Sequence, residues 1–361
     1  MHLISCNPPH LKSPSPKSLS SISIQRYPLI DILRLPCAAL VVLIHCLEIK
    51  EGHPFAHMIV SCFSSQAVPF FFIVSGFFFA LKIRSSSDPL ADTLHYVKKQ
   101  LLLYLTWMII ELPSIISTYH QLYPNASFPL FSLLLIRRIF FAGQGVYWYI
   151  LILAQSCLIA GVCILHQKEK LLYSVSVLGL FLAFIYEAQI SAMGLNHLNT
   201  LFYVVFSRSN NVIMKGLPFV ALGVYLSKQI PRSTFAISKL IAAYLLTGFI
   251  SITIFFYCYF QHFSSPRFLF LYPIQAALLF LIGIHGHSNA SSSVCRTFRE
   301  ASSSIYFLHT IVLYRIVNPI WSVHAPILLK FSLSCLIALL LYSIIKKTHL
   351  KPLYFLLSLK S

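Results

Sequence analysis

The stretch LIDILRLPCAALVVLIHC, residues 29–46, decides the fold of this chain. It is an apolar run of the length that an α-helix needs to cross the hydrocarbon core of a bilayer, about 20 residues. Only Asp31, Arg34 and His45 interrupt it with ionisable side chains. Such groups are costly inside a membrane helix, so each is a candidate functional residue.

Arg34 and His45 are predicted to share one face of this helix. Eleven helical residues turn through about 1,100°, which returns to within about 20° of the starting direction, and they rise about 16 Å. Asp31 lies one turn before Arg34, where its carboxylate can partly neutralise the guanidinium. The alternative is that Arg34 anchors the helix at the headgroups and that His45 is a hydrogen-bonded polar residue near the outer interface.

The composition of the whole chain agrees with residence in a membrane. Of its 361 residues 57% are hydrophobic and 10% are charged, whereas a soluble protein carries about 25% charged residues. The net charge of +18 is typical of basic cytoplasmic loops, and the absence of a soluble basic domain argues against nucleic-acid binding. The sequence therefore predicts an all-α polytopic membrane protein whose partner is the lipid bilayer.

Apolar segments of suitable length recur along the chain, and they predict about ten transmembrane helices. Most of the 27 lysine and arginine residues fall on one side if the N-terminus is cytoplasmic, so the positive-inside rule places both termini there. Residues 1–25 are expected to form a disordered cytoplasmic tail, residues 26–348 the transmembrane domain and residues 349–361 a second tail. Segment 128–142 is too short to span and is expected to lie at the interface or to dip partway into the membrane. The predicted spans are 28–48, 57–83, 97–119, 144–166, 170–190, 211–228, 236–260, 266–285, 302–323 and 325–345.

The nine cysteines lie mostly inside apolar runs and form no CxxC pair. Small apolar packing residues are therefore the expected role, in place of a disulfide framework or a zinc site. No metal site is predicted.

Several blocks resemble the acyltransferase 3 family, whose members are multi-span bacterial membrane enzymes that often acetylate surface polysaccharides. The first is the Arg-x10-His spacing of Arg34 and His45. The others follow in the order of the family over nearly the whole chain: SCFSSQAVPFFFIVSGFFFALKIR (61–84), YVKKQLLLYLTWM (96–108), GVYWYILILA (145–154), LPFVALGVYL (217–226) and ASSSIYFLHTIVL (301–313).

The resemblance implies transfer of an acyl group, expected to be acetyl, from acyl-CoA to a hydroxyl of a surface or exported glycan at the bacterial inner membrane. His45 is the expected general base, because a neutral imidazole can take the proton of an attacking hydroxyl, and Arg34 and Asp31 complete the catalytic group. Acetyl-CoA is the implied co-substrate. The residues expected to bind substrate are Lys82, Arg84, Lys98, Lys99, Ser75, Trp148, Tyr306 and His309.

One feature departs from the family. Members often carry an Arg-x-x-Arg pair where this chain has Lys98 and Lys99 followed by leucines, so several basic residues would have to share the phosphates of the donor.

Ser75 with Gly76 is also explained by close helix packing, which we favour over an acyl-enzyme formed on Ser75. Glu111 lies within a predicted span, where an unpaired carboxylate is costly; pairing with Arg315, pairing with Lys330 and a role as a second acid are all open at the level of the sequence.

A transporter or flippase is the alternative function, because buried ionic groups among ten helices suit that class too. The sequence shows no related halves with broken helices in matching places. The acceptor hydroxyl, the acyl group and the oligomeric state remain open at the level of the sequence.

Overall fold

The computed structural model describes residues 27–46, 60, 62–142, 145–188, 210–230, 235–260, 271–321 and 326–357. The tail predicted over residues 1–25 lies outside these ranges. Within them the chain is helical and contains no strand, which confirms the all-α prediction. The main helices are α1 (Pro28–Cys46), α3 (Ala67–Arg84), α4 (Pro89–Leu122), α5 (Phe128–Arg137), α6 (Trp148–Leu165), α7 (Glu169–Ala188), α9 (Leu217–Gln229), α10 (Ile237–Phe260), α11 (Leu271–His285), α12 (Ser292–Val312), α13 (Asn318–Trp321), α14 (Ile327–Lys347) and α15 (Lys351–Leu356).

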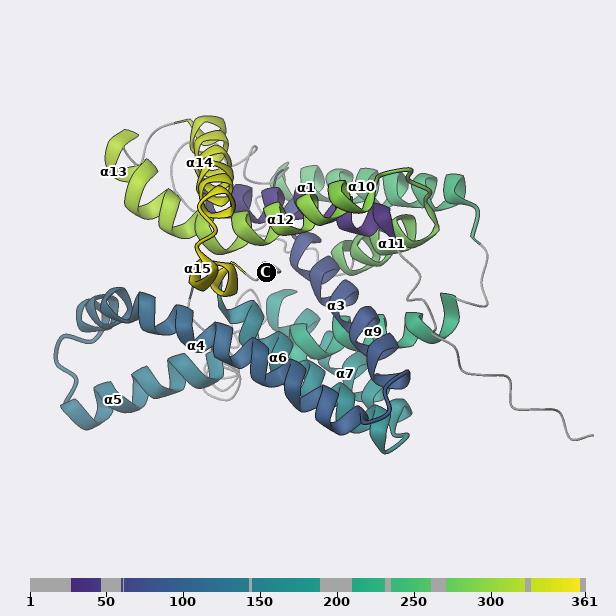
Figure 1. Ribbon diagram of the computed structural model, residues 1–361, viewed down its shortest axis with the longest axis horizontal. Helices are drawn as coiled ribbons and strands as arrows, with labels where there is room; N and C mark the ends of the chain where they lie inside the picture. Colours follow the sequence, from purple (N-terminus) through teal and green to yellow (C-terminus); the bar gives the residue numbers. More distant parts are fainter. Residues whose placement is uncertain are drawn as a thin grey trace, which may run out of the picture.

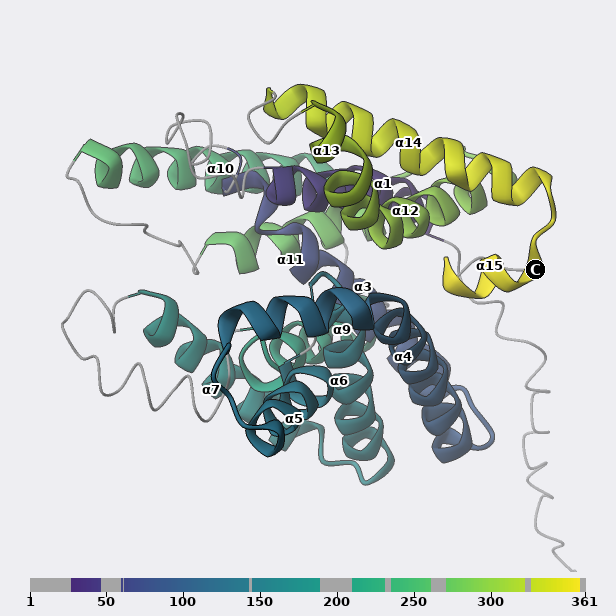
Figure 2. The ribbon, with the colours of Figure 1, turned by 90° about the vertical axis from the view of Figure 1, so that its left-hand side faces the viewer.

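The helices form two groups (Figures 1 and 2). Helices α1, α10, α11, α12 and α14 pack together in one group, and α4, α6, α7 and α9 pack in the other. Helix α3 packs against α9 and α6 and also against α1 and α11, so it joins the two groups. Segments distant in sequence, such as α1 and α12, therefore lie side by side.

Seven helical segments of the described chain are long and apolar enough to cross a membrane. They coincide with seven of the predicted spans. The other three spans are helical where described but differ in form: a π-helical stretch, Val212–Gly216, precedes α9, α11 has 15 residues, and a second π-helical stretch, Leu313–Val317, separates α12 from α13. The membrane fold is thus confirmed, and the count of ten stays a prediction.

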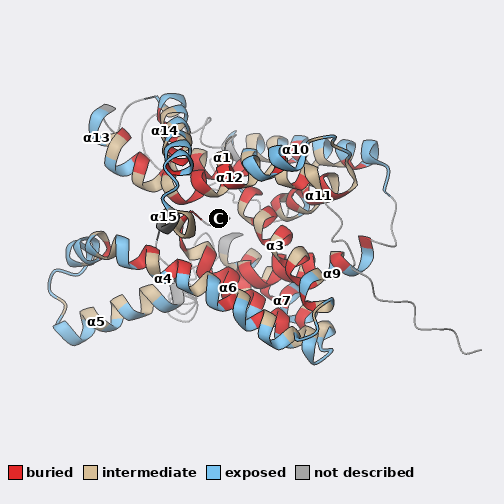
Figure 3. Cartoon of the chain, viewed as in Figure 1, coloured by how far each residue is buried: buried red, intermediate tan, exposed pale blue. Residues whose placement is uncertain are grey.

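Many of the exposed positions of the bundle, drawn pale blue in Figure 3, carry large hydrophobic side chains. Ile109, Val177 and Leu245 are among the large hydrophobic side chains that are exposed. A surface of this kind is suited to lipid tails and unsuited to water. Helix α5 buries none of its residues, and the interfacial position expected for segment 128–142 stays a prediction.

Two glycines allow α3 and α9 to approach closely. A Cβ atom added to Gly76 would lie 2.9 Å from the Cα of Val220, and one added to Gly223 would lie 2.7 Å from the backbone nitrogen of Phe77. Backbone therefore lies against backbone at this crossing, as small residues permit in membrane bundles. The packing role favoured for the Ser75–Gly76 pair applies to Gly76.

The chain after α14 folds back into the bundle. His349 takes a left-handed conformation, with φ of 53°, and α15 follows it. The indole Nε1 of Trp107 donates to the carbonyl of Leu356 at 3.1 Å, and Leu357 is buried. Part of the segment expected as a C-terminal tail is thus packed against α4.

Candidate functional site

Asp31, Arg34 and Arg299 form a charged cluster where α1 meets α12. A terminal nitrogen of Arg34 lies 3.7 Å from Asp31, and Arg299 donates to the same carboxylate at 3.1 Å. Arg299 therefore takes the closer contact with Asp31. The Nε–H of Arg34 is buried and donates to no partner among the described residues, so this arginine keeps hydrogen-bonding capacity for another group.

Two tyrosine hydroxyls lie near Arg34. Its guanidinium lies within electrostatic range of Tyr149 and Tyr96, which come from α6 and α4. The hydroxyl of Tyr149 lies 3.3 Å from that of Ser75 on α3. Four helices thus bring one cation and three hydroxyls to one region of the interior.

His45 and His309 form a second cluster farther along α1. Their ring centroids are 5.3 Å apart with an interplanar angle of 40°. His309 is completely buried, and its Nδ1 lies 2.8 Å from the carbonyl of Tyr306 and 3.1 Å from that of Ile305. Because carbonyl oxygens only accept, Nδ1 carries the proton in the neutral ring, which leaves Nε2 as the basic nitrogen.

Tyr306 connects the two clusters. Its ring centroid lies 5.7 Å from that of Tyr149 and 6.2 Å from that of His309. Its hydroxyl donates to the carbonyl of Val146, which fixes the ring between α12 and α6. Arg34 and His45 both face neighbouring helices, and the tyrosines lie between them.

Trp148 lies at the edge of this region. Its ring centroid is 6.2 Å from that of Phe72, whereas the neighbouring Tyr149 comes within 4.6 Å of the same ring. Tyr149 therefore contacts more of the site than the tryptophan that the sequence indicated.

The basic residues expected to hold donor phosphates do not form one group. Lys82 pairs with Asp92 at 2.8 Å. Arg84 pairs with Glu169 at 2.9 Å, and that carboxylate also pairs with Lys228, so Arg84 ties α3 to α7 and α9. Lys98 and Lys99 on α4 are exposed and are the better placed of the four to receive an anion from solution.

Glu111 pairs with Arg315, whose nitrogen lies 3.6 Å from the carboxylate. This contact joins α4 to the π-helical stretch after α12 and settles the choice between the two cations. Lys330, the other candidate, is buried near Cys46 of α1.

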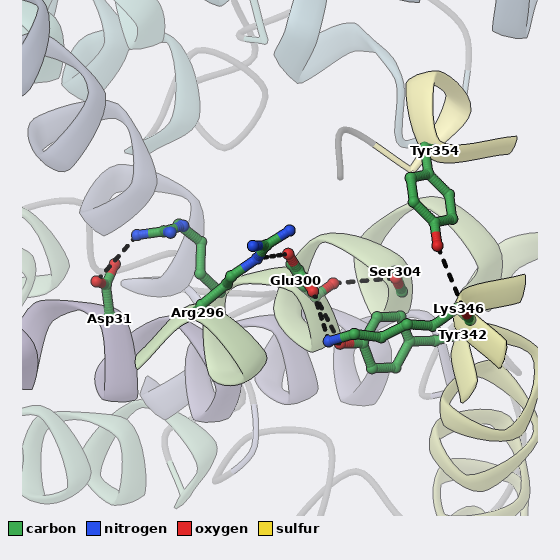
Figure 4. A network of polar contacts seen from close by, with 8 residues as sticks. Asp31, Arg296, Glu300, Ser304, Tyr342, Lys346 and Tyr354 are labelled. Atoms are coloured by element: carbon green, nitrogen blue, oxygen red, sulfur yellow. Dashed lines mark hydrogen bonds and ion pairs between the residues drawn. The ribbon is translucent and has the colours of Figure 1, made fainter. Parts of the chain in front are cut away.

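A carboxylate that the sequence reasoning passed over, Glu300 within α12, joins this helix to α14 (Figure 4). Arg296 donates to it at 2.6 Å, and Lys346 and Tyr342 of α14 each donate at 3.0 Å. Glu300 precedes the predicted span 302–323. Burial by itself raises the pKa of Glu300, but the three hydrogen bonds outweigh burial and hold the pKa below its usual value.

Sequence reasoning also missed Tyr149 and Tyr96. Tyrosine is common in apolar helices, and neither residue stands at an informative spacing from Arg34. The one available signal was position, because Tyr149 directly follows Trp148 and Tyr96 lies two residues before Lys98.

The fold and the site define a helical membrane protein with an interior line of ionisable and hydroxyl side chains. Comparison with known families identifies the class: the family described as an acyltransferase domain matches residues 27–346. The chain therefore belongs to the acyltransferase 3 family.

One curated relative is a serine/alanine racemase from Enterococcus gallinarum, 25% identical over 294 residues. The matched region is 78% of this chain but 40% of the relative, so the chain spans less than half of that protein's length. No solved structure matches the chain.

Proposed function

We propose that this protein transfers an acyl group, acetyl in the simplest case, from acyl-CoA to a hydroxyl of a surface or exported glycan at the bacterial inner membrane. Membership of the acyltransferase 3 family supports the acyl transfer. The observation that carries the assignment of the site is the His45–His309 pair, because two imidazoles 5.3 Å apart in the interior provide a base without a metal or a covalent intermediate.

The reaction requires one proton to move twice. As the acceptor oxygen attacks the thioester carbonyl, His45 takes the hydroxyl proton and a C–O bond forms. The tetrahedral intermediate then expels the coenzyme, the C–S bond breaks, and the sulfur takes the proton back from the imidazolium. The products are the acylated glycan and free coenzyme A.

His309 has a positioning role in this scheme. Its Nδ1–H is directed at the carbonyls of Tyr306 and Ile305, so its ring orientation is set by the backbone of α12. A ring fixed in this way holds His45 in a defined place and stabilises the charge that His45 acquires. Loss of His309 should therefore slow the transfer less than loss of His45.

The donor would enter on the side predicted to be cytoplasmic. Lys98 and Lys99 are exposed there, and lysines act as point charges toward phosphate groups. Arg34 lies farther in, about 16 Å from His45 along α1. That separation suits an extended pantetheine arm which carries the thioester to the histidines.

The test is ester-linked acyl content of cell-surface glycans, compared between cells that carry the wild-type chain, His45→Ala and His309→Ala. His166→Ala is the matched control, because His166 is exposed at the end of α6. We expect His45→Ala to abolish the acyl ester, His309→Ala to reduce it and the control to leave it unchanged. Full acylation by a well-inserted His45→Ala protein would refute the role of His45.

Transport or flipping is the second candidate, because the ion pairs of Asp31 with Arg34 and Arg299 among membrane helices also suit a transporter. A transporter releases no thiol from acyl-CoA. Membranes that contain the chain should therefore be assayed for thiol release from acetyl-CoA, with membranes containing His45→Ala as the blank. Equal release from both would favour the second candidate.

A further inference from the structure

Tyr149 and Ser75 form a polar contact near Arg34, and the ring of Tyr306 links Tyr149 to His309. Ser75 lies on α3 and Tyr149 on α6, and their oxygens are 3.3 Å apart. This is long for a bond between hydroxyls, whose usual length is about 2.7–2.8 Å. The two side chains are thus loosely paired in a position that α3 and α6 both support.

Both hydroxyls retain capacity for a ligand. A hydroxyl offers one donor and two acceptor positions, and the Ser75–Tyr149 contact uses one donor and one acceptor. Among the described residues, neither hydroxyl makes another hydrogen bond. Ser75 and Tyr149 are also only half-buried, although helices α1, α3, α6 and α12 surround them.

The side chains next to these hydroxyls are aromatic. The ring of Tyr149 lies 4.6 Å from that of Phe72, 6.3 Å from that of Phe71 and 5.7 Å from that of Tyr306. A ligand that fits here has apolar segments for the rings and an amide or carbonyl for the hydroxyls. Arg34, with its buried open Nε, limits the region on one side.

We propose that Ser75 and Tyr149 bind the pantetheine arm of the acyl donor through its amide groups, and so hold the thioester near the His45–His309 pair. This inference rests on the proposed function. Each pantetheine amide brings one N–H donor and one carbonyl acceptor, and its methylene groups lie against the aromatic rings. Tyr149 and Ser75 are therefore positioning residues for the donor, and they take no part in the proton transfer.

The experiment measures the Kd of two probes, coenzyme A and pantetheine, for the full chain in lipid nanodiscs by titration calorimetry. Tyr149→Phe removes only the hydroxyl and keeps the ring. We expect it to weaken both probes about tenfold, the usual effect of one hydrogen bond, and Ser75→Ala to act in the same direction. Tyr225→Phe is the control, since Tyr225 is exposed on α9.

A double replacement of Lys98 and Lys99 by alanine distinguishes binding of the pantetheine arm from binding of the nucleotide phosphates. It should weaken coenzyme A and leave pantetheine unchanged, because pantetheine has no nucleotide. The thermal unfolding midpoint of each variant shows whether the fold is kept, and a Ser75→Ala protein that folds provides the test if Tyr149→Phe does not.

Failure of the pantetheine site and failure of the proposed function give different results. Unchanged Kd values for both probes in folded Tyr149→Phe and Ser75→Ala overturn the pantetheine site while the proposed function stands. A wild-type chain that binds neither probe and releases no thiol from acetyl-CoA overturns the proposed function, and the pantetheine site falls with it.

Discussion

Replacing Gly76 by alanine should separate α3 from α9 and damage the site beside it. The new Cβ would lie 2.9 Å from the Cα of Val220 and closer still to the carbonyl oxygen of that residue. Carbon atoms in contact are about 3.5–4.0 Å apart, so the helices must move apart by roughly 0.6–1 Å. The obstacle is backbone, which cannot rotate away as a side chain can.

The expected cost follows from the same geometry. Overpacking a close interface costs about 1–3 kcal/mol, and the higher helix propensity of alanine returns less than about 1 kcal/mol. Gly223 of α9 lies against α3 at the same crossing, where an added Cβ would be 3.0 Å from the carbonyl carbon of Gly76, so α9 has little room to adjust. We expect a net loss of stability of about 1–2 kcal/mol.

The assay is thermal unfolding of the purified chain in detergent, followed by the binding of coenzyme A. Gly248→Ala on α10 is the control, because the nearest atoms to its added Cβ are 3.8 and 3.9 Å away, ordinary contact distances. Gly76→Ala should lower the unfolding midpoint by a few degrees and weaken coenzyme A, since Ser75 moves away from Tyr149. Equal midpoints for Gly76→Ala and wild type, or an equal drop in the control, would refute the close-packing argument.

Three further changes test other contacts of the structure. Glu111→Gln should destabilise the chain by about 1 kcal/mol, and adding Arg315→Gln should cost little more, which a double-mutant cycle of unfolding midpoints checks. Glu300→Gln should lower stability by about 1–3 kcal/mol near neutral pH. Because the pKa of Glu300 is lowered in the fold, this contribution is complete above the unfolded-state pKa of about 4.3 and is lost as pH falls through the lower folded-state pKa. The wild-type and Glu300→Gln midpoints should therefore converge in acid, and a constant difference down to pH 3 would contradict this. Trp107→Phe keeps the aromatic ring but loses the bond to Leu356, so residues 351–357 should exchange amide hydrogen faster, measured by mass spectrometry with residues 89–95 as the internal reference.

Local patterns were sufficient to predict the class of fold. Long apolar runs can satisfy their backbone groups in lipid only as helices, so α1, α4 and α14 followed directly from composition and length. The three spans that differ in form are those where a polar residue, a proline or a π-helical stretch breaks the run, as at Val212–Gly216. Their boundaries depend on neighbouring helices.

The sequence could also place Arg34 and His45 on one face of α1, because the helical repeat is a local property. It could not pair His45 with His309, which lies on α12 and more than 260 positions later in the numbering. It could not show that Arg84 is held by Glu169 or that Arg315 is the partner of Glu111. Contacts between distant helices depend on which faces pack, and ridge packing allows several arrangements of the same apolar surfaces.

The amino-acid sequence by itself thus determined that this chain is helical, that it resides in a membrane and that α1 carries its ionisable face inward. These properties follow from hydrophobic length and helical period, which each segment contains within itself. Only the tertiary structure decided that Tyr149, Ser75 and Tyr306 lie between Arg34 and the two histidines. Side chains from four helices meet there because α3 crosses between the two helical groups, and no single segment contains that information.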